Sequence, residues 1–292
     1  MKLLLYGQHF KNEDHHFIVE AVRRMSRLNF DLLVNKVIAD LLNSHGDLEI
    51  PSLCDTYDAL QKERPDLVIT FGGDGTILSA LRLVKDSNIP IMGTNLGRLG
   101  FLSGVERLRF DEALDIIGTN KYRIEERTLL SLKEPKRLFG NTPFALNDFT
   151  LSKRVTSSMV TIHTYIDGVF LNSYWADGLI VSTPTGSTGY SLSCGGPIIF
   201  PGCGNFVITP IAPHNLNVRP IIVKDDVQIK FKIDGRAEKY LCTLDSRFEI
   251  IGRDVELTIE KSPFNLKLAF LPDSNFMKTI NEKLNWGFDK RN

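Results

Sequence analysis

The stretch that most constrains the fold is DLVIT followed by FGGDGTIL, residues 66–78. A short apolar run, typical of a buried strand, ends at a loop with three glycines, and residues 76–84 then have helical spacing. In open α/β sheets, a loop of this kind lies at the carboxyl end of a strand, where ligands bind. Glycines let the backbone approach a phosphate, and the following helix directs unpaired N–H groups toward it. The stretch therefore predicts a polyphosphate site at the edge of a sheet.

The first 120 residues alternate between strand-like and helix-like segments. Strands are predicted at residues 2–6, 66–71 and 89–93, and helices at residues 15–28, 31–43, 76–84 and 110–117. This alternation is typical of a parallel sheet with helices on its faces. We therefore expect an α/β domain over residues 1–120 that carries the GGDG loop. A last helix is predicted at residues 275–284, and the tail 272–292 is expected to pack back on this domain.

Short segments with alternating apolar and polar residues predominate after residue 120. They are found at residues 146–152, 159–166, 169–174, 227–233, 239–244 and 255–259. Asp167-Gly168 fits a tight hairpin turn, and Asp234-Gly235 is a candidate for a second one. We therefore expect residues 121–271 to form a β-rich, sandwich-like domain, with a short helix opening in the glycine- and serine-rich stretch 185–195.

Composition excludes several classes of function. The 35 basic and 35 acidic residues cancel, so no bulk charge favours nucleic acid or an anionic membrane. The apolar start MKLLLYG is too short for a signal peptide, and no apolar run approaches the ~20 residues that cross a bilayer. Cys54, Cys194, Cys203 and Cys242 are scattered without close pairs, which predicts free thiols and a cytoplasmic location.

Asp74 needs its own explanation, because a bare carboxylate beside a phosphate is repulsive. It could accept the proton of an attacking hydroxyl, or lie near a magnesium ion that neutralises both groups. A third interpretation is that Asp74 simply caps the helix that follows the loop. The loop alone leaves these alternatives open.

Five motifs occur in one order along the chain. They are FGGDGTIL (71–78), GTNLGRLGFLS (93–103), ALNDFTLSK (145–153), DGLIVSTPTGSTGYSLSCGGPI (177–198) and PIAPHNLNVRP (210–220). Together they closely resemble the NAD kinase family. The resemblance implies transfer of the γ-phosphoryl group of ATP to the 2′-hydroxyl of the adenosine ribose of NAD, which gives NADP. It also implies an α/β domain joined to a β-rich NAD-binding domain. A divalent metal, usually Mg²⁺, with unassigned ligands, and a homodimer or homotetramer are implied as well.

The resemblance also assigns roles to residues that match the motifs. Asp74 is the implied proton acceptor. The implied phosphate loop for ATP comprises Gly72, Gly73, Thr76 and Asn95. The implied NAD contacts are Gly75, Phe101, Asn147, Asp148, Trp175, Asp177, Thr188, Gly189, Tyr190, Ser191, Leu192, Ser193, Asp245 and Arg247.

Four of these positions depart from the common pattern of the family. Many members have glutamate at the position of Asp148 and alanine at that of Gly189. Trp175 replaces an arginine of some members, and Arg247 replaces a glutamine.

Two rival functions share part of this pattern. Lipid and sphingoid kinases also have a G-G-D-G-T loop, but the motif at residues 177–198 opposes that assignment. A non-catalytic NAD-binding regulator would keep the dinucleotide motifs, but it would have no use for Asp74. Formation of NADP decides among the three.

Overall fold

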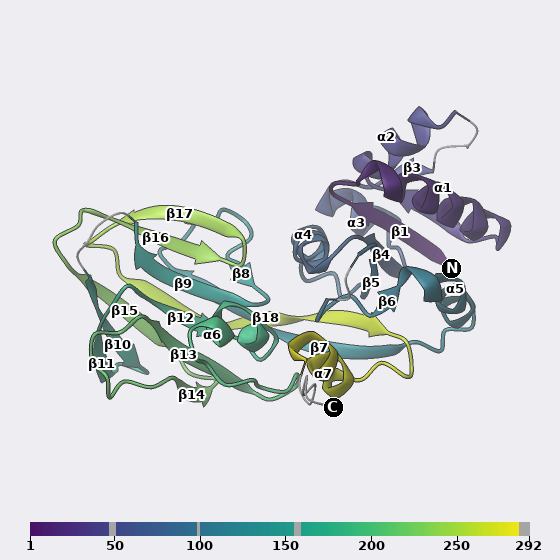
Figure 1. Cartoon of the computed structure of the whole chain (residues 1–292). Coiled ribbons are helices and arrows are strands. Elements are labelled where there is room, and N and C mark those ends of the chain that lie inside the picture. The colour runs from purple at the N-terminus through teal and green to yellow at the C-terminus, as the bar shows by residue number, and fades with distance from the viewer. Residues whose placement is uncertain (47–50, 98–99, 155–158, 286–292) are drawn as a thin grey trace, which may run out of the picture. The chain divides into compact units, whose positions relative to one another are not determined.

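The computed structural model describes residues 1–46, 51–97, 100–154 and 159–285, and the chain divides into two compact units (Figure 1). Unit 1 comprises Met1–Glu126 and Leu266–Asn292, and unit 2 comprises Arg127–Asn265. Within the described ranges, no helix is long and apolar enough to cross a membrane. Residues 286–292 of the predicted tail lie outside the described part of the chain.

Unit 1 contains a parallel sheet in the order β5-β4-β1-β2-β3. Its strands are β1 (Lys2–Gly7), β2 (Asp31–Val34), β3 (Ser52–Leu53), β4 (Leu67–Phe71) and β5 (Ile91–Asn95). The short strand β6 (Val105–Glu106) and the end of β18 (Leu257–Phe270) pair with β5 in the same direction. β4 and β5 are buried along their length, and β1 is buried except at Lys2 and Tyr6, as expected for mainly apolar parallel strands that are covered on both faces.

The helices of unit 1 are α1 (Asn12–Arg27), α2 (Lys36–Ser44), α3 (Tyr57–Glu63), α4 (Asp74–Val84), the 3₁₀ turn Arg107–Arg109, α5 (Phe110–Gly118) and α7 (Phe276–Leu284). Alternate residues of β1 and β4 pack with α1, α2 and α5 in one apolar core. α4 contacts β1, β4 and β5, and its buried residues lie outside that core. The predicted α/β domain with a mostly parallel sheet is confirmed.

Unit 2 is built from two antiparallel sheets that pack face to face. One has the order β14-β13-β12-β9-β16-β17, and the other includes β11-β10-β15-β18. Their bounds are β9 (Asp148–Lys153), β10 (Val160–Ile166), β11 (Val169–Ala176), β12 (Gly178–Ser182), β13 (Asn205–Ile211), β14 (Ile221–Lys224), β15 (Ile229–Asp234), β16 (Lys239–Leu244) and β17 (Arg247–Gly252). β7 (Arg123–Glu134) also pairs with β8 (Phe144–Ala145). Phe149 of β9 stacks on Phe231 of β15 with 5.7 Å between ring centroids, which confirms the sandwich-like arrangement.

Three local predictions have clear outcomes. The helix predicted at residues 31–43 is wrong in its first part, because Asp31–Val34 is strand β2 and α2 begins only at Lys36. Asn35 marks the boundary, since its side chain caps α2 by accepting the Ile38 N–H. Asp167-Gly168 is the predicted hairpin turn, with φ of +48° and +80°.

The second turn candidate, Asp234-Gly235, is not a hairpin. β15 ends at Asp234, and β16 begins at Lys239 in the other sheet, so this connection joins the two layers of the sandwich.

Candidate active site

The glycine loop joins β4 to α4, and its glycines have different structural needs. Gly72 has φ of +147°, and a Cβ there would lie 2.2 Å from the Thr76 hydroxyl oxygen. Gly73 has φ of −87°, and a Cβ at Gly73 or Gly75 would meet nothing within 4 Å. Gly72 is therefore required by the fold. Open space instead surrounds Gly73 and Gly75, beside the first N–H groups of α4, which a helix leaves unpaired.

Asp74 is the first residue of α4, but its carboxylate does not cap that helix. Gly73 is the N-cap residue and makes no side-chain cap. The carboxylate instead accepts hydrogen bonds from the turn at residues 101–103. Oδ2 accepts the Phe101 N–H at 2.8 Å, and Oδ1 accepts the Leu102 N–H, the Ser103 N–H and the Ser103 hydroxyl, each at 3.2 Å. The capping interpretation of Asp74 is therefore replaced by a carboxylate that is held by a second loop.

Asn95, a predicted member of the phosphate loop, uses its side chain for hydrogen bonds within the segment that includes this second loop. Its side-chain oxygen accepts the Gly97 N–H at 2.7 Å, and its amide donates to the Ser103 hydroxyl at 3.1 Å. Phe101, a predicted NAD contact, is half-buried, and its ring centroid lies 6.5 Å from that of Phe276 in α7. Thr76, at the start of α4, is buried beneath Gly72.

Unit 2 brings Asn147, Asp148 and Asp245 together. The Asp245 carboxylate accepts the backbone N–H groups of Leu146 at 3.1 Å, Asn147 at 2.7 Å and Asp148 at 3.4 Å. It thereby fixes the backbone that presents the Asn147 and Asp148 side chains. Asp245 itself has φ of +52° and is half-buried, and the desolvation of its carboxylate raises its pKa.

Asp148 is a strongly perturbed acid among the predicted NAD residues. Burial in the sandwich, followed by the charge of Asp245, raises the pKa of Asp148 from 3.8 to about 7. The Thr150 hydroxyl donates to Asp148 Oδ1 at 3.2 Å and opposes the rise only in part. A carboxyl group with this pKa changes its charge near neutral pH, which is common at functional sites.

The long motif at residues 177–198 packs against Asn147. It forms β12, the 3₁₀ turn Thr185–Thr188 and α6 (Tyr190–Ser193). The carbonyl of Asn147 accepts the Thr183 N–H at 2.9 Å, and a Cβ on Gly186 would lie 2.1 Å from that same oxygen. Gly186 therefore allows the close approach that places the start of α6 beside Asp148.

The predicted NAD residues of this motif differ in how accessible they are. Gly189, Tyr190 and Ser193 are exposed, and Thr188 and Leu192 are half-buried. The charges of Asp148 and Asp177 both act on Tyr190, whose pKa is raised mainly by burial. Ser191 is fully buried, where its hydroxyl shares a 2.8 Å hydrogen bond with that of Thr209.

The remaining predicted contacts have protein partners. Asp177 forms an ion pair with Lys153 at 2.6 Å, and the exposed Trp175 ring lies 4.1 Å from the His214 ring, measured between centroids. The Arg247 guanidinium donates to the carbonyls of Thr142 and Phe144.

Sequence reasoning missed Ser103, Gly100, Gly186 and Lys153 as parts of these arrangements. All four lie within quoted motifs, but the reason for each residue is a contact with a distant part of the chain.

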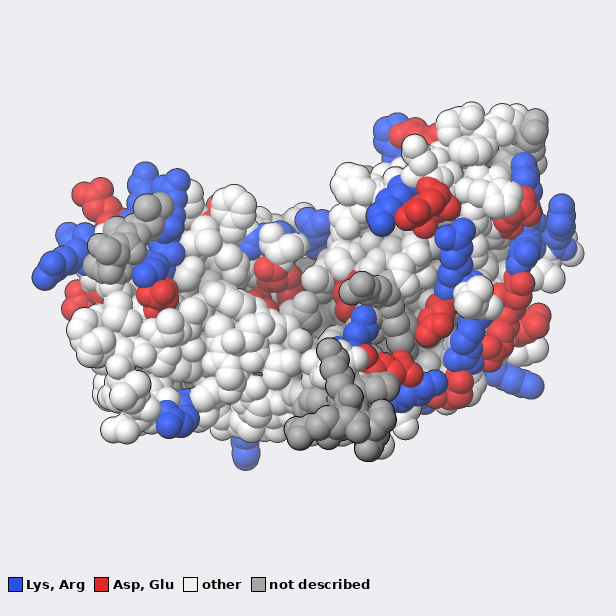
Figure 2. All heavy atoms as spheres, viewed as in Figure 1, with Lys and Arg blue, Asp and Glu red and all other residues white. Residues whose placement is uncertain are grey.

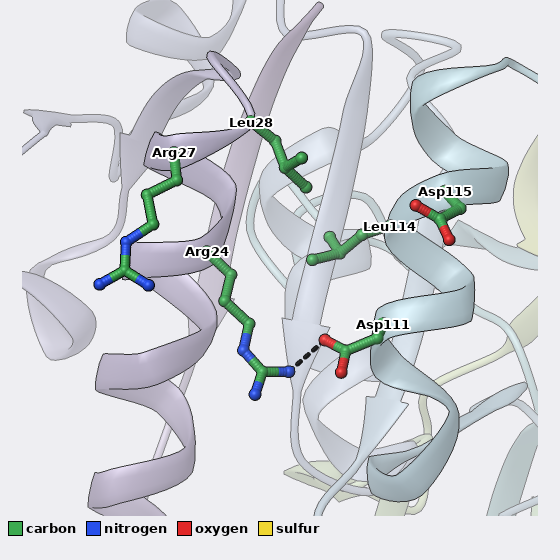
Figure 3. A pocket seen from close by; sticks show the side chains of 6 residues that line it. All are labelled: Arg24, Arg27, Leu28, Asp111, Leu114 and Asp115. Atoms are coloured by element: carbon green, nitrogen blue, oxygen red, sulfur yellow. Dashed lines mark hydrogen bonds and ion pairs between the residues drawn. The ribbon is translucent and has the colours of Figure 1, made fainter.

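A surface hollow of about 260 Å³ lies between α1 and α5 in unit 1 (Figure 3), and none of its lining residues belongs to the five motifs. Its lining comprises Arg24, Arg27, Leu28, Asp111, Leu114 and Asp115. Arg24 and Asp111 form an ion pair across it.

On the face of unit 1 in view, acidic and basic side chains are intermixed (Figure 2). Within the described ranges, no group of three or more histidine, cysteine, aspartate or glutamate residues is arranged to hold a metal ion.

Comparisons with known proteins cover both units. The ATP-NAD kinase N-terminal domain matches residues 10–122, and the ATP-NAD kinase C-terminal domain matches residues 146–271. A protein named NAD kinase from Cytophaga hutchinsonii is 46% identical over 293 residues, which is 100% of each chain. Another from Flavobacterium psychrophilum is 44% identical over 299 residues, again 100% of each chain.

Two solved structures share the fold. An NAD kinase from Archaeoglobus fulgidus in complex with ATP has a TM-score of 0.75 and 25% identity, and the match covers 98% of this chain and 99% of that one. A yeast NADH kinase complexed with NADH has a TM-score of 0.87 and 23% identity, with 100% and 89% covered. The resemblance predicted from the five motifs is therefore confirmed, and the chain belongs to the ATP-NAD kinase family.

Proposed function

We propose that this protein is an NAD kinase, which transfers the γ-phosphoryl group of ATP to the 2′-hydroxyl of the adenosine ribose of NAD. Family membership supports this assignment over a lipid kinase. The observation that carries it is the Asp74 carboxylate, which is held beside the glycine loop by four donors from residues 101–103.

Asp74 supplies the general base in this proposal. A carboxylate has about four acceptor positions, two on each oxygen. Among the residues that the structure describes, Oδ1 receives three donors and Oδ2 receives only the Phe101 N–H. Oδ2 therefore has room to accept the proton of a ribose hydroxyl. A base at hydrogen-bond distance from a poor nucleophile contributes typically ~10²–10⁴-fold to the rate.

The glycine loop supplies the site for ATP phosphates. Open space at Gly73 and Gly75 lets phosphate oxygens approach the backbone, and the N-terminus of α4 favours their charge. Magnesium normally keeps several waters and binds through substrate phosphates, so we assign the divalent cation to the substrate, as Mg-ATP. Alignment and charge stabilisation dominate phosphoryl transfer, and a rigid loop serves both.

Unit 2 supplies most of the proposed NAD contacts. Asn147 and Asp148 present an amide and a carboxyl group to ribose hydroxyls, and Asp177 is proposed to accept from the NAD carboxamide. The exposed Tyr190 and Trp175 rings offer surfaces for stacking. Arg247 and Asp245 already bind unit 2 backbone groups, so we propose that they act by holding the residues that touch NAD.

The test is Asp74→Asn, assayed for NADP with a coupled NADP-specific dehydrogenase in the presence of Mg-ATP and NAD. We expect turnover to fall by about 10²-fold or more, with little change in either KM. Asp58→Asn, an exposed acid of the same unit, is the control. Full activity of Asp74→Asn would eliminate the base. A wild-type protein that binds NAD without producing NADP would favour the regulator, and phosphorylation of a lipid alcohol instead would favour the lipid kinase.

The quaternary structure and the location complete the proposal. We propose a homodimer or homotetramer, which light scattering after gel filtration measures directly. All four cysteines are free, which suits the reducing cytoplasm in which we place the enzyme.

A further inference from the structure

A chain of hydrogen bonds behind Asp74 leads through two buried side chains. Ser103 is 2% exposed and Asn95 is 3% exposed. The Ser103 hydroxyl lies 3.2 Å from Asp74 Oδ1 and 3.1 Å from the amide nitrogen of Asn95. We propose that Ser103 is a positioning residue, oriented by Asn95, that fixes the Asp74 carboxylate and leaves Oδ2 as the proton acceptor. This inference rests on the proposed role of Asp74 as the base.

The direction of each hydrogen bond in the chain is determined. The Asn95 side-chain oxygen accepts the Gly97 N–H at 2.7 Å, so its NH₂ group must face Ser103. The Ser103 oxygen also accepts the Gly100 N–H at 3.2 Å. Because both acceptor positions of this hydroxyl are filled, its proton can only point to Asp74 Oδ1.

The loop is also shaped to reach the carboxylate. A Cβ on Gly100 would lie 1.8 Å from Asp74 Oδ1 and 2.7 Å from Oδ2, so only glycine allows the turn to come this close. Side-chain and backbone donors therefore converge on Oδ1 from one side. This convergence saturates Oδ1 and leaves the free acceptor position of Oδ2 available to a substrate hydroxyl.

The two oxygens of Asp74 therefore have different roles, because Oδ1 is held by protein donors and Oδ2 accepts the substrate proton. Without the Ser103 hydroxyl, Oδ1 keeps two backbone donors, and the carboxylate can rotate about its χ2 angle. A general base that is misplaced by about 1 Å can lose on the order of 10²-fold in rate. The effect should fall on turnover, because Ser103 is buried and cannot touch either substrate.

The principal test is Ser103→Ala in the full-length protein, assayed for NADP formation with Mg-ATP and NAD varied separately. We expect kcat to fall about tenfold to a hundredfold, with both KM values within twofold of wild type. Ser103→Thr retains a hydroxyl and should recover most of the lost kcat. Ser262→Ala is the matched control, because Ser262 is also buried, at 5% exposure, and its hydroxyl has no hydrogen-bond partner in the described part of the chain.

A second variant tests the direction of the chain. In Asn95→Asp, the new carboxylate can still accept from Gly97, but it can only accept from Ser103, which turns the Ser103 proton away from Asp74. The same loss of kcat is expected, and this variant decides the outcome if Ser103→Ala does not fold.

Three results would overturn the inference. They are a kcat of Ser103→Ala equal to that of Ser262→Ala, a loss confined to KM, or an Asn95→Asp variant with wild-type kcat. Asp74→Asn separates these failures from failure of the proposed function. If Asp74→Asn is inactive and Ser103→Ala is fully active, only the positioning role of Ser103 is refuted. If Asp74→Asn is active, the proposed role of Asp74 as the base is refuted.

Discussion

Asp148 should make the stability of unit 2 depend on pH in a way that a single substitution removes. Its folded-state pKa is about 7, whereas its ordinary value is 3.8. Because the folded pKa is raised, the folded state binds more protons than the unfolded state between these values. The stabilisation from the protonated carboxyl is complete below pH 4 and is lost as pH rises through 7.

The magnitude follows from the difference between the two pKa values. Roughly 3 pH units, at about 1.36 kcal/mol each, give a loss of about 4 kcal/mol at pH 8 relative to pH 4. Asp148→Asn is isosteric, keeps an acceptor for the Thr150 hydroxyl and cannot ionise. Its advantage over wild type should therefore grow by about 1.4 kcal/mol per pH unit up to pH 7 and then level off.

The assay is urea unfolding of both proteins at pH 4.5, 6, 7 and 8, followed by circular dichroism. Carboxyl groups far from Asp148 cancel in the difference between the two proteins. Asp254→Asn, at an exposed acid of the same unit, is the control and should differ from wild type equally at every pH. A gap between Asp148→Asn and wild type that stays constant from pH 4.5 to 8 would refute the reasoning.

Three further substitutions test the loops. In Gly72→Ala, the alanine must adopt a positive φ and its Cβ clashes with the Thr76 side chain. Urea unfolding should therefore show a destabilisation of about 2 kcal/mol or more. Gly100→Ala should displace the Asp74 carboxylate and abolish NADP formation in the coupled assay, whereas Gly118→Ala, with only ordinary contacts, should stay active. Arg247→Lys removes the guanidinium group that donates to two backbone carbonyls, and thermal unfolding should show that the free energy of unfolding falls by about 2 kcal/mol.

The order of secondary structure in unit 1 could be predicted where strands and helices were long and bounded by glycine. β4 and its loop were found because a run of buried apolar residues meets Gly72 directly. β2 was missed because Leu32, Leu33 and Val34 fit the apolar stripe of a helix as well as a short strand. The boundary depends on Asn35, whose capping role appears only when the Ile38 N–H is located.

Several strands of unit 2 were missed for comparable reasons. β13 contains Pro210, which argues against a strand, and it accommodates this residue beside β12. β14 and β17 are edge strands with mixed exposure, so their patterns are weak. A local pattern carries little information when one side of a strand has no neighbour.

The candidate residues could be named from motifs, but their structural contacts could not. Ser103 binds Asp74 from 29 positions away, and Arg247 binds Thr142 from 105 positions away. Such contacts depend on the tertiary fold, which neither spacing nor composition reports. Asp245 illustrates the difference, because its motif predicted an NAD contact but gave no sign of the three backbone N–H groups that its carboxylate binds.

Asp148 is buried and Asp245 is half-buried, and the two carboxylates receive unequal numbers of hydrogen-bond donors. This inequality predicts how NAD should bind. From the residues that the structure describes, Asp245 receives three N–H donors, whereas the Asp148 side chain receives the Thr150 hydroxyl. Ribose hydroxyls would add donors to ionised Asp148 and lower its pKa in the complex. NAD should therefore release a proton on binding between pH 6 and 7, and its affinity should rise with pH across this range.

Calorimetry in buffers of different ionisation enthalpy measures the proton released on binding, and Asp148→Asn should abolish it. Equal proton release from wild type and Asp148→Asn would show that another group titrates. No release from wild type at pH 6.5 would mean that the ribose hydroxyls do not reach Asp148. The same raised pKa would then account for the pH dependence of stability without any part in binding.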